Sequence, residues 1–139
     1  MKQPDETRRE FVRQWLAKAD EDLALAHHIV ASNAPFLNAI GFHSQQAAEK
    51  YIKAYLVSIQ VDFPKTHDIE ALLKIIAGHN QTMAHSLEDA IALTDFGVEA
   101  RYPANLPELS TAQAREAVKL ADKVHTKIVG ALKQSGYID

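Results

Sequence analysis

Residues 42–56 read FHSQQAAEKYIKAYL. They lie within a longer stretch, about residues 35–60, that contains no proline after Pro35 and only one glycine, Gly41. Its apolar side chains recur every three or four residues, as expected for one side of an α-helix: Phe36, Ile40, Ala47, Tyr51, Ala54 and Tyr55. Four polar residues fall within an arc of about 80° at the helical 100° per residue: His43, Gln46, Lys50 and Lys53. The stretch therefore predicts a long helix with one apolar side and one polar stripe.

Four further segments carry helical signals. Residues 7–31 open with Thr7-x-x-Glu10, the form of a capping box, and residues 110–133 open with a second match, Ser110-x-x-Gln113. Residues 68–77 end before Gly78, and residues 82–96 end before Gly97. The apolar stripe predicted for residues 7–31 is Phe11, Val12, Trp15, Ala19, Leu23, Ala26 and Val30. That predicted for residues 110–133 is Ala114, Ala117, Val118, Ala121, Val124, Ile128 and Leu132.

No strand-like alternation competes with these helices, so the expected fold class is all-α. We expect an antiparallel bundle of about five helices, three long and two shorter. The length of 139 residues suits a single domain. We place this domain at residues 7–135, with residues 1–6 and 136–139 as flexible ends.

Composition excludes several classes of function. The absence of cysteine removes disulfides, thiolate zinc sites and cysteine nucleophiles. Residues 1–10 are polar, unlike a signal peptide, and no apolar run is long enough to span a membrane. A net charge of -3 argues against a large basic surface for duplex DNA. We therefore expect a cytoplasmic protein without a membrane partner.

Asp22 is a carboxylate on the apolar side of its helix, between Trp15 and Ala26. A buried carboxylate is costly unless it is paired or hydrogen-bonded. The first interpretation is a structural ion pair that joins two helices, with Glu49 as a second buried polar group. The alternative is that Asp22 orients a basic residue of a ligand pocket.

Three further features suit an anionic ligand. His43, Gln46, Lys50 and Lys53 could recognise a base and its phosphates, although lysines on a helix are commonly just solvated. His67 lies at a helix start, where free N–H groups favour an anion, although Thr66 or Asp68 could simply cap the turn. If the fourth helix continues past Gly97, Arg101 lies on its inner face and needs an anion from protein or phosphate.

Several common catalytic patterns are missing from the sequence. No two of the seven histidines are three or four residues apart, and Glu-x-x-His does not occur. The P-loop and the Gly-x-Ser-x-Gly elbow are also absent. His125 interrupts an apolar stripe and is interpreted as a core or interface histidine. We expect no metal site and no cofactor.

Four blocks together resemble the HEPN domain, in the form found as small prokaryotic proteins. They are Trp15-Leu16-x-Lys18-Ala19-x-x-Asp22-Leu23, Phe42-His43-x-Gln45-Gln46-Ala47-Ala48-Glu49-Lys50-x-x-Lys53-Ala54, Lys65-Thr66-His67-Asp68-Ile69 and Glu99-Ala100-Arg101-Tyr102-Pro103. The resemblance implies a helical bundle, a homodimer and an association with nucleotides or RNA. It also implies, as for many members, a two-component pairing of toxin–antitoxin type with a minimal nucleotidyltransferase.

The sequence departs from the ribonuclease members of that family. Those members carry an Arg-x(4–6)-His motif, and no arginine of this chain has a histidine at that spacing. The sequence therefore favours a non-catalytic module that binds a nucleotide or RNA. Two alternatives stay open: an atypical ribonuclease toxin using Arg101 with His43 or His67, and a purely structural helical dimer. For the non-catalytic module, we predict one site for an anion, surrounded by Lys50, Lys53, His67 and Arg101, with His43, Gln46 and Tyr102 beside it.

Overall fold

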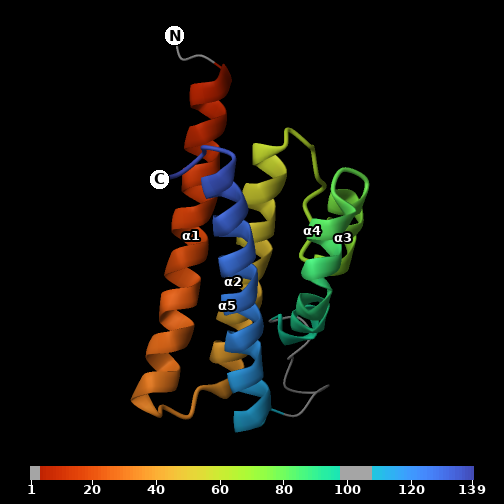
Figure 1. Cartoon of the computed structure of the whole chain (residues 1–139). Coiled ribbons are helices and arrows are strands. Elements are labelled where there is room, and N and C mark those ends of the chain that lie inside the picture. Colours follow the sequence, from red (N-terminus) through yellow and green to blue (C-terminus); the bar gives the residue numbers. More distant parts are fainter. Residues whose placement is uncertain (1–3, 98–107) are drawn as a thin grey trace.

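The computed structural model describes residues 4–97 and 108–139 and is all-helical there (Figure 1). Three long helices dominate: α1 (Pro4–Ser32), α2 (Leu37–Ser58) and α5 (Thr111–Gln134). Between α2 and α5 come α3 (Ile69–Ala77), α4 (Gln81–Ser86) and a 3-10 helix, η1 (Glu88–Phe96). The predicted fold class, a helical bundle, is confirmed. Among the described residues, no helix is long and apolar enough to cross a membrane.

The central element is α2, which packs against both α1 and α5 and also touches α3 and η1. Fourteen of its 22 residues are buried, as expected for a helix covered on most sides. Alanines on all three long helices, such as Ala19, Ala48 and Ala117, are fully buried and let the helices approach closely. In Figure 1, α3, α4 and η1 lie to one side of the three long helices.

Several local predictions are confirmed. The side chain of Ser110 accepts a hydrogen bond from the Gln113 N–H, and the Gln113 side chain accepts one from the Ser110 N–H, which completes a capping box. Asp68 caps α3 by accepting from the Glu70 N–H. The buried residues of α5 are the seven of the predicted stripe. His125 is half-buried, with its ring edge-on to that of Tyr51.

The start of the first helix differs from the prediction. Because α1 already includes Pro4, Thr7 lies inside the helix and does not cap it. Phe11, predicted on the apolar side, is 50% exposed, whereas Val12 and Leu16 are buried. The buried positions of α1 follow the strict spacing of three and four from Val12, which leaves Phe11 outside the stripe.

The segment predicted as a fourth helix is instead two shorter elements, α4 and η1. A 3-10 helix has three residues per turn, so residues three apart share one face. Leu87, Ala90 and Leu93 have this spacing and are buried, and Phe96 continues the row and packs against the same core. The 3-10 geometry therefore packs against the core four side chains that an α-helix would spread around its axis.

The helical segment ends at Phe96, and Gly97 has an extended backbone with ψ of 157°. The condition for placing Arg101 on the inner face of a continuing helix is therefore not met. Arg101 and Tyr102 themselves lie outside the described residues.

The end of the chain, predicted to be flexible at residues 136–139, makes specific contacts at Tyr137. Its hydroxyl accepts a hydrogen bond from Arg8 at 3.1 Å and donates one to the Ser58 carbonyl at 2.9 Å. The guanidinium of Arg9 lies over the Tyr137 ring, 5.1 Å from its centre. These contacts join the last residues to α1 and to the end of α2.

We expect Gly41→Ala to lower the free energy of unfolding by about 1–2 kcal/mol, because overpacking outweighs the helix propensity gained. A Cβ at Gly41 would overlap a methyl group of the buried Leu109 and lie 3.3 Å from Phe96 Cβ. Gly130→Ala in α5 is the matched control, since its Cβ would meet nothing within 4 Å. Urea denaturation should show Gly130→Ala stabilised and Gly41→Ala destabilised; equal stabilisation of both would contradict this packing of α2.

Candidate functional site

Asp22 of α1 contacts two polar groups of α2. Its Oδ1 lies 2.9 Å from His43 Nδ1, and its Oδ2 accepts a hydrogen bond from Lys50 Nζ at 2.5 Å. The Asp22 side chain is 13% exposed. His43 and Lys50 are seven residues apart, two turns of α2, so they reach the same carboxylate from one side of the helix. Asp22 thereby links α1 to the polar stripe of α2.

Glu49 forms the second carboxylate centre and is more deeply buried, with a side chain 3% exposed. It accepts a hydrogen bond from Lys53 Nζ at 2.9 Å and lies 2.8 Å from His67 Nδ1. The Gln45 side-chain amide also donates to Glu49, at 3.2 Å, and to the His67 carbonyl at 3.3 Å. Glu49 therefore binds groups of its own helix and of the segment that precedes α3.

Lys53 belongs to this buried centre, because its side chain is 8% exposed. Its Nζ lies 5.5 Å from the centre of the Trp15 ring and 5.9 Å from that of Phe63. The two rings meet edge-on at 6.4 Å. Aromatic faces attract an ammonium group, so the rings and Glu49 together compensate a lysine removed from water. The same contacts hold Phe63, and with it the segment leading to His67, against α1 and α2.

A pair of glutamines extends the Glu49 centre along α2. The Gln46 amide donates to Gln45 Oε1 at 2.8 Å, and Gln45 in turn donates to Glu49. Gln46 lies on the predicted polar stripe between His43 and Lys50, next to the Asp22 centre. We call these eight residues the polar network: Asp22, His43, Gln45, Gln46, Glu49, Lys50, Lys53 and His67. A Cβ at Gly97 would lie 4.0 Å from Gln45 Oε1, so the chain toward Arg101 starts beside this network.

Both histidines of the network have a defined tautomer when neutral. An ionised carboxylate can only accept a hydrogen bond, so Nδ1 of each ring must carry the proton. The other nitrogen, Nε2, then has a lone pair that can accept a hydrogen bond or a proton. The two rings differ in accessibility, since the His43 side chain is 23% exposed and that of His67 is 76% exposed.

The charges of the network balance. Lys50 is paired with Asp22 and Lys53 with Glu49, so with neutral histidines the network carries no net charge. The predicted stripe residues thus share one face of α2, but the structure turns Lys53 inward onto Glu49 and leaves Lys50 partly accessible. His67 joins them through Glu49. Arg101 and Tyr102 lie outside the described residues.

Sequence reasoning did not assign Gln45, Trp15 or Phe63 to the site. Gln45 precedes Glu49 by four residues, one helical turn, which is a signal for a hydrogen bond between them. Phe63 is distant from Trp15 and Lys53 in sequence, and no spacing rule connects them. Within residues 4–97 and 108–139, no cluster of His, Cys, Asp and Glu could hold a metal ion.

Comparison with known proteins adds one match. The family model of the HEPN domain matches residues 12–132, most of the chain. Neither the curated proteins nor the solved structures contain a match. The matched range begins in the first half of α1 and ends near the end of α5, so it includes every residue of the polar network. The chain therefore belongs to the HEPN domain family.

Proposed function

We propose that this protein is a nucleotide- or RNA-associated HEPN module, acting in the cytoplasm as the non-catalytic partner of a minimal nucleotidyltransferase. In this proposal it forms a homodimer and belongs to a two-component system of toxin–antitoxin type. Family membership supports the association with nucleotides or RNA. The lack of an Arg-x(4–6)-His motif supports the non-catalytic role.

The polar network is the observation that carries the proposal. The partly buried Asp22 fixes His43 and Lys50, and the buried Glu49 fixes His67, so the polar groups are ordered before any ligand arrives. Ordering them in advance lowers the entropic cost of binding. Histidine and glutamine side chains can recognise the edges of a base, and Lys50 can contact a phosphate. Such a surface suits a nucleotide or a short single strand more than a duplex.

A second candidate function, an atypical ribonuclease, is favoured by the contact between Glu49 and His67. A buried carboxylate that holds Nδ1 of an exposed histidine leaves Nε2 as a general base. In RNA cleavage, Nε2 would take the proton of a 2′-hydroxyl, whose oxygen attacks the adjacent phosphorus. The P–O5′ bond would break, giving a 2′,3′-cyclic phosphate and a 5′-hydroxyl once a general acid protonates the leaving oxygen.

An RNA cleavage assay in the presence of a chelator separates the two candidates. The proposed non-catalytic role predicts that single-stranded RNA stays intact under conditions in which the protein binds it. Cleavage that His67→Ala removes, and that His79→Ala retains, would instead establish the ribonuclease. His79 is the matched control because it is also exposed but lies outside the polar network.

A further inference from the structure

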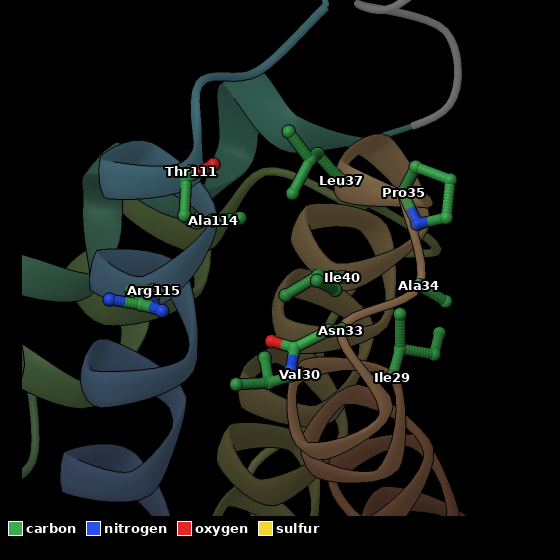
Figure 2. A pocket seen from close by; sticks show the side chains of 10 residues that line it. All are labelled: Ile29, Val30, Asn33, Ala34, Pro35, Leu37, Ile40, Thr111, Ala114 and Arg115. Carbon is green, nitrogen blue, oxygen red and sulfur yellow. The ribbon is translucent and has the colours of Figure 1, made fainter.

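A cavity lies away from the polar network, where the end of α1 and the start of α5 diverge over α2 (Figure 2). Its volume is about 290 Å³. None of its described lining residues belongs to the network. Its floor is apolar and includes Ile29, Val30, Leu37 and Ile40. Ile40 belongs to a small hydrophobic cluster, with Ala114 and Val118, that is separate from the main core.

Three polar side chains lie at this cavity: Asn33, Thr111 and Arg115. In Figure 2, Val30, Asn33 and Ile40 extend toward the gap in front of α5, and Arg115 lies across from them on α5. Arg115 is the one charged side chain among the described residues that line the cavity. It is exposed, and it makes no hydrogen bond or ion pair within the part of the chain that the structure describes.

The backbone conformation of Asn33 places its side-chain amide at the cavity. Its φ of 56° is in the left-handed region, which asparagine tolerates better than most residues, and its N–H donates to the Val30 carbonyl. This turn ends α1 and leaves the Asn33 side chain at the cavity mouth. Thr111 is the first residue of α5, where the helix dipole favours a negative charge.

We propose that this cavity binds a small monocarboxylate with an apolar body. The apolar floor would take the hydrocarbon or aromatic part, and Arg115 would pair with the carboxylate, assisted by Asn33 and Thr111. Ligand pockets combine an apolar lining with a few polar groups and usually measure about 300–1,000 Å³. The volume here is at the lower end of that range and suits a compact ligand. A single arginine matches one negative charge better than the several charges of a nucleotide phosphate chain.

The test uses phenylacetate and its neutral counterpart, phenylacetamide, as probes in an NMR titration of the full chain. Phenylacetate should shift the amide signals of residues 29–40 and 111–115 in a saturable way. Phenylacetamide should bind about tenfold more weakly, because it lacks the negative charge that strengthens a hydrogen bond from Arg115. No saturable shift of these signals by phenylacetate, or equal affinity for both probes, would overturn the proposal.

Variants then identify the groups responsible. Arg115→Gln should weaken phenylacetate binding by about the same tenfold factor and leave phenylacetamide unchanged. Lys119→Gln is the matched control, since it removes one exposed cation of α5 that does not line the cavity. If Lys119→Gln weakens binding as much as Arg115→Gln, the attraction is general electrostatics and the proposed pairing is refuted.

Discussion

Glu49→Ala is expected to lower the free energy of unfolding by about 3–5 kcal/mol, the cost of leaving one partner of a buried ion pair without the other. The carboxylate is 3% exposed and bonds to Lys53, His67 and Gln45. Its removal leaves the Lys53 ammonium, itself 8% exposed, with aromatic rings but no counter-charge. Urea denaturation followed by circular dichroism measures the loss.

Two variants define what this loss means. Glu70→Ala is the matched control, because Glu70 pairs with Lys74 at the same i,i+4 spacing but on the surface, and should cost less than about 1 kcal/mol. The double variant Glu49→Leu with Lys53→Met should recover much of the stability, because no buried charge remains unpaired. A cost for Glu49→Ala as small as that for Glu70→Ala would contradict the burial of this pair.

Arg101→Ala is expected to weaken nucleotide binding by roughly 10- to 100-fold while the protein stays folded. This factor corresponds to the loss of one charge-assisted hydrogen bond. The reason is the charge balance of the polar network, in which Asp22 and Glu49 already neutralise Lys50 and Lys53. Lys50 can donate a hydrogen bond to a phosphate, but the net positive charge that balances a phosphate must come from outside the network. We propose that Arg101 supplies this charge. Calorimetric titration with the same nucleotide measures the change.

Asp22→Asn should change binding in the opposite direction. It removes the counter-charge of Lys50, whose partly exposed ammonium could then pair with a phosphate, so affinity should rise by about 3- to 10-fold. Arg13→Ala is the control for a general loss of positive charge, since Arg13 is exposed on α1. If Arg101→Ala lowers the melting temperature and leaves binding unchanged, the arginine is structural. If Asp22→Asn weakens binding, the ordering of His43 and Lys50 by Asp22 matters more for binding than the charge that Asp22 neutralises.

The long helices could be predicted from sequence because their signals are local. The α5 stripe and its Ser110–Gln113 capping box depend on spacings within one helix, and both were confirmed. The η1 segment was predicted as α-helix because Leu87, Ala90, Ile91 and Thr94 have the spacing of one α-helical face. The spacing of Leu87, Ala90, Leu93 and Phe96 by three becomes decisive once it is clear that all four side chains face the core.

The candidate site was predictable to a smaller extent, because its contacts join distant segments. Asp22 stood out as a charge on an apolar face, which is a local observation. Its partners, His43 and Lys50, depend on how α1 packs against α2. Lys53 looked like part of a solvated stripe, yet Trp15 and Phe63 cover it. No property of residues 50–53 alone separates the accessible lysine from the buried one.

Calorimetric titration of the wild-type protein with ATP, other nucleotides and short single-stranded RNAs tests the central claim most directly. The proposed function predicts saturable binding of at least one of these ligands, with a dissociation constant below about 1 mM, and no RNA cleavage in the same samples. The account would be contradicted if none of these ligands gave binding heat with protein that circular dichroism shows to be folded. The protein would then not be a nucleotide- or RNA-associated module.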